Sequence, residues 1–145
     1  MESELHVDGS IKFYTWDDDE GKQAFWHSSA HILAQTIKFF YPKSKLTIGP
    51  SIENGFYYDV DFDGDNISEN DFQKLEAKFL EFARTDSQFK MKSISKDEAL
   101  EFYKKEKNQY KVELIEGLDD GTITFCDHSD FSDLCRGGHI PSTGI

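Results

Sequence analysis

Two short pairs of histidine and cysteine, placed near opposite ends of the chain, constrain its fold more than any other feature. The first pair is His27 and His31 in HSSAH, and the second is Cys135 and His139 in CRGGH. Together they include three of the five histidines and one of the two cysteines. Three histidines and a cysteine are a ligand set that zinc accepts, and the same groups can bind or attack a carbonyl. If the pairs act together, the fold must bring both ends of the chain to one site.

The composition predicts one domain in a reducing compartment, with a cytoplasmic location. A chain of 145 residues can bury a core, and thirteen Phe, six Tyr and two Trp provide bulky side chains for it. No apolar run reaches the length of a membrane span, and the N-terminus lacks a signal-peptide segment. Two cysteines are too few for a disulfide framework. The net charge of −12 argues against a broad phosphate-binding face but allows a narrow site for one nucleotide end.

Hydrophobic periodicity predicts three helices. Pro42 would end the first, while Ser68 and Ser95 are expected N-caps of the second and third. On the first helix His27 and His31 lie one turn apart and therefore share a face. The helices are expected at about 22–41, 69–84 and 96–106.

Alternating apolar residues and turn signals predict several short strands between and after these helices. The stretch GPSIENG has the composition of a turn. The strands are expected at about 11–16, 45–48, 55–62, 89–94, 110–115, 122–126 and 133–135. Helices and strands in irregular alternation indicate an α+β domain with a mainly antiparallel sheet.

Each chemical feature also has a plain structural interpretation. The HSSAH pair could be a metal or catalytic pair, or one packed and one exposed histidine; Ser28 stands where a zincin protease has its glutamate base. The two glycines of CRGGH predict a sharply bent loop, either near a ligand or simply holding a buried Cys135.

Two charged residues and two further histidines complete the candidates. Asp133 lies two positions before Cys135, so in a strand both side chains would share a face. Lys111 would point from the strand at 110–115 away from its apolar face, and a solvated lysine is the simpler interpretation. His6 and His128 have acidic neighbours and are expected to face solvent.

Four segments, taken in order, resemble the editing domain of threonyl-tRNA synthetase. They are HSSAHILAQ, KLTIGPSIENGFYYDV, YKVELIEG and DLCRGGHIPSTG, and the resemblance covers roughly residues 11–145. The two His/Cys pairs alone are shared with the editing domains of alanyl-tRNA synthetase and their freestanding relatives. The stretches GPSIENGFYYD and RGGHIPSTG favour the threonyl type. One departure is Gly138, where that family commonly has proline.

The resemblance implies a two-layer sandwich of a mainly antiparallel sheet and a long helix, with the site in the cleft between them. It also implies a single editing domain over residues 1–145, in which residues 1–10 are a linker from an upstream domain. Aminoacylation and anticodon-binding domains would lie downstream. The chain has no class II catalytic motif, so no ATP site is expected in it.

The activity implied is hydrolysis of seryl-tRNA for threonine. Serine lacks one methyl group of threonine, and a pocket that admits threonine rejects serine by only about 10–200-fold. A second site that hydrolyses the seryl ester would correct the resulting errors. The expected partners are the 3′ aminoacyl-adenosine end of threonine tRNA and the remaining synthetase domains, with neither DNA nor a membrane.

Carried onto this sequence, the family's site has six catalytic residues and two substrate contacts. The resemblance gives Lys111 and His27 the positioning and activation of a water, and gives Asp133 the substrate amino group. The remaining residues would shape the pocket. The catalytic set is His27, His31, Lys111, Asp133, Cys135 and His139, and the substrate contacts are Tyr58 and the backbone near Gly49.

Zinc at the quartet His27, His31, Cys135 and His139 is the main alternative that the resemblance leaves open. The alanyl-type relatives hold zinc with these four positions, whereas the threonyl type is thought to work without a metal, so no cofactor is expected. Two other functions remain open: a zinc-binding, non-catalytic tRNA-binding module, and a trans-editing domain of the alanyl type.

Overall fold

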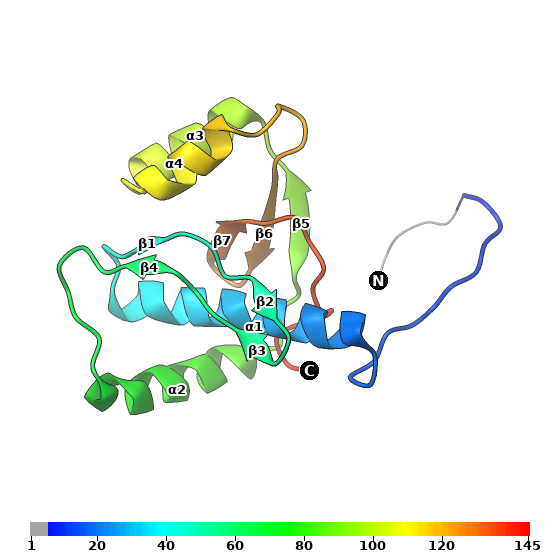
Figure 1. The fold of residues 1–145 in the computed structure, drawn as a ribbon, viewed down its shortest axis with the longest axis horizontal. Coiled ribbons are helices and arrows are strands. Elements are labelled where there is room, and N and C mark those ends of the chain that lie inside the picture. Colours follow the sequence, from blue (N-terminus) through cyan, green and yellow to red (C-terminus); the bar gives the residue numbers. More distant parts are fainter. Residues whose placement is uncertain (1–5) are drawn as a thin grey trace.

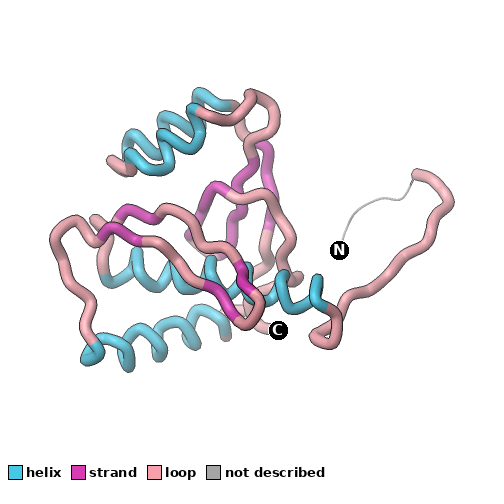
Figure 2. Tube along the Cα trace, viewed as in Figure 1, coloured by secondary structure: helices cyan, strands magenta, loops and turns pink. Residues whose placement is uncertain are grey.

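The computed structural model describes residues 6–145 as an α+β fold, which confirms the predicted class (Figure 1). The predicted linker at 1–10 lies partly outside these residues. Figure 2 separates helices from strands along the same trace. The helices are α1 (Asp19–Phe40), α2 (Glu69–Ala83), α3 (Lys96–Lys105) and α4 (Gln109–Glu116). The strands are β1 (Lys45–Leu46), β2 (Ser51–Ile52), β3 (Gly55–Phe56), β4 (Val60–Asp61), β5 (Lys90–Ser93), β6 (Thr124–His128) and β7 (Phe131–Leu134).

The strands of the described residues pair only in antiparallel fashion, as predicted, but they form three small sheets instead of one main sheet. β1 pairs with β4, β2 with β3, and β5, β6 and β7 form a three-stranded sheet. The predicted strand at 55–62 is interrupted, since β3 and β4 pair with different partners. The GPSIENG turn contains β2 and leads into β3, so it forms a small hairpin.

The first hydrophobic cluster lies between α1, α2 and the β1–β4 pair. Its buried residues are Ala34, Ile37, Tyr41, Leu46 and Leu75. α1 begins with acidic residues in its first turn, where the helix dipole favours negative charge, and stops before Pro42. α2 begins at the predicted cap, because the Asp71 carboxylate accepts from the Ser68 backbone N–H at 2.8 Å.

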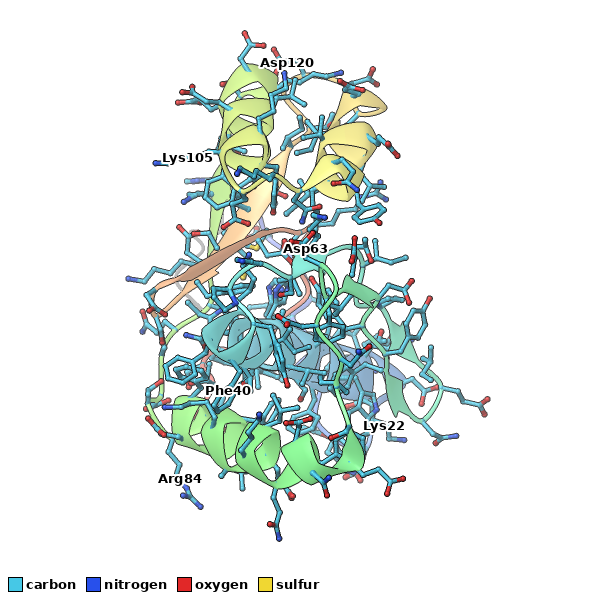
Figure 3. All side chains as sticks on the ribbon, turned by 90° about the vertical axis from the view of Figure 1, so that its left-hand side faces the viewer. Lys22, Phe40, Asp63, Arg84, Lys105 and Asp120 are labelled. Carbon is cyan, nitrogen blue, oxygen red and sulfur yellow. The ribbon has the colours of Figure 1, made fainter. Side chains whose placement is uncertain are left out.

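The second hydrophobic cluster lies between α3, α4 and β6. Its buried residues are Ala99, Tyr103, Ile115, Ile123 and Phe125. The predicted capping box starts α3, because the Glu98 N–H donates to Ser95 Oγ at 3.3 Å and the Ser95 N–H donates to the Glu98 carboxylate at 3.2 Å. In side view the helices form three levels, with α2 at the bottom, α1 in the middle, and α3 and α4 at the top (Figure 3).

Two predicted strands are wrong. Residues 110–115 belong to helix α4, because the Asn108 side chain caps the segment by accepting from the Lys111 N–H at 3.2 Å. The buried residues of α4, Lys111 and Ile115, are spaced i, i+4, which is the period of a helix. Residues 11–16 form no strand and are exposed, since no described segment offers them a ladder of hydrogen bonds.

None of the helices in residues 6–145 is both long and apolar enough to cross a bilayer.

Candidate functional site

The two His/Cys pairs meet, as the sequence predicts. Cys135 Sγ is the common centre: it lies 3.4 Å from His27 Nε2, 3.4 Å from His31 Nε2 and 3.2 Å from His139 Nε2. The four ligand atoms all lie within 4.8 Å of one another. Helix α1 therefore faces the loop after β7 across a gap that one small molecule or ion can bridge.

Ser28 joins the two motifs. Its side chain is fully buried, donates to the Ala24 carbonyl at 2.7 Å, and accepts from the Ile140 N–H at 3.1 Å. The position that would hold a glutamate in a zincin thus docks the C-terminal loop onto α1. The serine hydroxyl both donates and accepts here, whereas an ionised glutamate could only accept.

The glycines of CRGGH set the path of that loop. Gly137 and Gly138 have φ of +95° and +85°, a region that side chains with a Cβ rarely adopt. Proline fixes φ near −65° and cannot take this conformation. The loop of this chain therefore follows a path that the family's usual proline at Gly138 would not allow.

Asp133 is the centre of a second, buried group. Its Oδ1 accepts from Lys111 Nζ at 2.8 Å, from Tyr103 Oη at 2.8 Å and from the Leu134 N–H at 2.9 Å. Its Oδ2 accepts from Tyr58 Oη at 2.7 Å. A carboxylate has about four acceptor positions, and these four donors match that number. His31 Nδ1 lies a further 4.0 Å from Oδ2.

Lys111 reaches this carboxylate from α4, and its side chain is 3% exposed. The interpretation as a solvated lysine is therefore wrong. Lys111 is buried on α4, and the Asp133 carboxylate balances its positive charge. Burial would raise the pKa of Asp133, but the charge of Lys111 and the hydrogen bonds from Lys111 and Tyr58 hold that pKa below its usual value. Lys111 and Asp133 thus form a buried ion pair at the site.

Gly49 and Tyr58 are coupled by close packing. A Cβ on Gly49 would come within 2.3 Å of the Tyr58 ring, so only glycine leaves room for it. The ring held there places its hydroxyl on Asp133. These two predicted substrate contacts therefore also support the carboxylate.

Three residues that sequence reasoning missed, Phe89, Cys126 and His128, lie around the quartet. Phe89 stacks on the His139 ring, with centroids 5.2 Å apart and planes at 13°. Cys126 Sγ lies 3.7 Å from His139 Nδ1. His128 was expected to face solvent and is instead 2% exposed, because its ring packs against Phe89 at 4.9 Å and Phe131 at 5.4 Å. No local pattern in the sequence marks these contacts.

Burial keeps the quartet uncharged near neutral pH. It lowers the pKa of His31 to about 3 and that of His139 to about 4, and it lowers the pKa of His27 as well. Burial also raises the pKa of the Cys135 thiol to about 11. Without a metal, the quartet therefore adds no charge to the cavity, and its neutral imidazoles can still accept a proton from a reacting group.

Both groups line one cavity of about 880 Å³. α1 contributes His27 and His31, β7 contributes Asp133, the loop after β7 contributes Cys135, and α4 contributes Lys111. Gly49 and Tyr58 line the same cavity, whereas His139 does not line it and lies behind Cys135, His27 and His31. The volume falls within the range of pockets that hold drug-sized molecules.

The quartet also fits a metal ion. Ligand atoms around tetrahedral zinc lie roughly 3.3–3.6 Å apart when the bonds are about 2.0–2.3 Å. The three sulfur–nitrogen distances here are 3.2–3.4 Å, while all four ligand atoms lie within 4.8 Å, so some nitrogen atoms would move closer together around an ion. Such an ion would take Cys135 as a thiolate, against the raised pKa of the thiol. His27, His31, Cys135 and His139 could therefore hold a metal ion.

Similar proteins share one name. No protein-family model matches the chain. Proteins named threonine–tRNA ligase are 60% identical over 144 residues in Flavobacterium johnsoniae, 49% over 138 residues in Cytophaga hutchinsonii and 45% over 145 residues in Desulfatibacillum aliphaticivorans. These matches cover 99%, 95% and 100% of this chain, but only 21–22% of each relative. Nearly the whole chain thus matches one segment of threonine–tRNA ligases, which confirms the resemblance of its motifs to threonyl-tRNA synthetase.

Proposed function

We propose that this domain hydrolyses the seryl ester of threonine tRNA, as the editing part of a threonyl-tRNA synthetase. One observation carries the proposal: neutral His/Cys groups and the Lys111–Asp133 ion pair line a single cavity. Hydrolysis of an ester needs a base for water and a charge for the developing oxyanion, and this cavity offers both. The match to threonine–tRNA ligases supplies the substrate class.

The roles follow from accessibility and charge. Two histidines, His27 and His31, line the cavity, and His27 is the less buried of the two. His27 also contacts Cys135, and it is the base that accepts a proton from the attacking water. Lys111 is cationic and fixed, and it would stabilise negative charge on the ester oxygen. Asp133 is the single carboxylate in the lining of the cavity, so its negative charge would attract the substrate amino group.

His31, Cys135 and His139 would hold the shape of the pocket. His31 lies behind His27 on α1 and is 3% exposed, which suits a wall better than a proton shuttle to solvent. Selectivity for serine over threonine would come from a fit that leaves no room for one more methyl group. Overpacking by one methyl group costs about 1–3 kcal/mol.

The reaction is proposed without a metal, because the Lys111–Asp133 pair and His27 already supply charge and base. A zinc ion on the quartet, when bound, would supply a Lewis acid for the carbonyl or a bound hydroxide. The partners under this proposal are the 3′ end of threonine tRNA and the other domains of the synthetase, and the location is cytoplasmic.

Deacylation assays separate this proposal from its two alternatives. Serine attached to threonine tRNA and serine attached to alanine tRNA are offered to the purified protein, each with and without a chelator. We expect hydrolysis of the first substrate only, with equal rates in chelator. Hydrolysis of the alanine tRNA substrate would indicate the alanyl type. Stoichiometric zinc without hydrolysis of either substrate would indicate a binding module.

A further inference from the structure

The lining of the cavity is more positive than the protein as a whole. It contains Lys111 and Arg136 as cations and Asp133 as its single carboxylate. Two positive charges and one negative charge give the lining a net charge of +1, on a chain of net charge −12. A random set of residues from this acidic chain would instead be expected to carry a net negative charge.

The unbalanced positive charge of the lining belongs to Arg136. Lys111 is neutralised inside the cavity by Asp133 at 2.8 Å, whereas Arg136 is exposed and has no salt bridge or side-chain hydrogen bond within residues 6–145. It lines the cavity next to Cys135, and its exposure leaves the guanidinium accessible to a ligand from solvent. A planar guanidinium suits an anion that accepts two parallel hydrogen bonds.

We propose that Arg136 forms a subsite for the phosphodiester group on the 5′ side of the terminal adenosine. This inference rests on the proposed function, which places a 3′-seryl-adenosine in the cavity. Neither the serine nor the nucleoside carries a negative charge, so the phosphodiester is the nearest anion that such a substrate brings. The subsite lets an acidic domain recognise the end of a nucleic acid through one phosphate while it repels the rest of the backbone.

A pair of ligands that differ only by the phosphate tests the subsite. The first is adenosine with a non-hydrolysable 3′-seryl amide, and the second is the same molecule with a 5′-methyl phosphodiester. Calorimetry measures both with the wild type, Arg136→Ala and Arg84→Ala. Arg84 is the other arginine of the chain, is exposed at the end of α2, and does not line the cavity (labelled in Figure 3). Its substitution therefore makes the same change in charge away from the site.

We expect the wild type and Arg84→Ala to bind the phosphodiester about tenfold more tightly than the nucleoside, because charge-assisted hydrogen bonds are of that strength. Arg136→Ala should bind both ligands equally, with unchanged affinity for the nucleoside. Raising the salt concentration should weaken only the phosphodiester, and only while Arg136 is present.

Equal affinity of the wild type for the two ligands would overturn the subsite, as would a preference that survives in Arg136→Ala. An Arg136→Ala variant that loses both ligands alike would also overturn it, because the arginine would then act on the nucleoside or the serine. Failure of the proposed function looks different: the wild type would keep its tenfold preference and yet leave seryl-tRNA intact.

Discussion

Removing the charge of Lys111 should destabilise the protein strongly, because its partner is buried. Lys111→Met leaves the Asp133 carboxylate, 3% exposed, without its counter-charge. Breaking one side of a buried ion pair typically costs about 3–5 kcal/mol, which is a large part of the roughly 5–15 kcal/mol that stabilises a domain. For a chain of this size the melting temperature should fall by about 6–20 °C. A lysine that faced an open cleft from a strand would show no such loss.

The double variant Lys111→Met with Asp133→Asn separates stability from chemistry. The asparagine is neutral and its oxygen still accepts a hydrogen bond from Tyr58 or Tyr103, so the unfolding free energy should recover to within about 2 kcal/mol of the wild type. Single-turnover deacylation should remain about 10²–10⁴-fold slower in both variants. Chemical denaturation and deacylation are measured on the same preparations.

A loss below about 1 kcal/mol for Lys111→Met would refute the burial of this pair, since exposed pairs contribute that little. A double variant as unstable as the single one would show that the loss does not come from the unpaired carboxylate. Wild-type deacylation by either variant would remove Lys111 from the reaction.

Three further predictions follow from the site. His27→Ala should slow single-turnover deacylation by about 10²–10⁴-fold with a nearly unchanged melting temperature, and a rate within threefold of the wild type would show that another group activates the water. Gly49→Ala should displace the Tyr58 ring and cost about 1–3 kcal/mol in chemical denaturation, while an unchanged unfolding free energy would mean that the ring moves aside freely. Burial lowers the pKa of His31 to about 3 and of His128 to about 4, so the unfolded chain takes up more protons below pH 6.5. The free energy of unfolding should therefore be highest above about pH 6.5. As the pH drops toward 4, it should fall by up to about 1.4 kcal/mol per pH unit for each ring. His128→Phe should make this fall less steep, and equal slopes in the variant and the wild type would place His128 in solvent.

Features governed by neighbours in the sequence were predicted well. Helix α1 and the caps at Ser68 and Ser95 depend on local spacing and local hydrogen bonds, and the structure places them as expected. We predicted that HSSAH and CRGGH meet because both motifs hold residue types that metal sites and acyl chemistry use. The structure brings their four side chains together.

Features governed by tertiary contacts were missed. In 110–115 the apolar residues alternate as in a strand, and only the cap at Asn108 and the packing of Ile115 select the helix. Lys111 is buried because Asp133 is there to receive it, and His128 because Phe89 and Phe131 cover it. Asp133 is far in sequence from Lys111, and Phe89 is far from His128. Only Phe131 is near the residue that it covers, because it pairs with His128 across the β6–β7 turn.

The most direct measurement of the central claim is the ratio of two single-turnover rates: hydrolysis of seryl-tRNA and of threonyl-tRNA, both on threonine tRNA, by the wild-type protein. A cavity that hydrolyses the seryl ester and excludes one more methyl group should favour the seryl substrate by at least about tenfold. Equal rates for the two substrates, or no hydrolysis of either, would contradict the assignment of this cavity as an editing site.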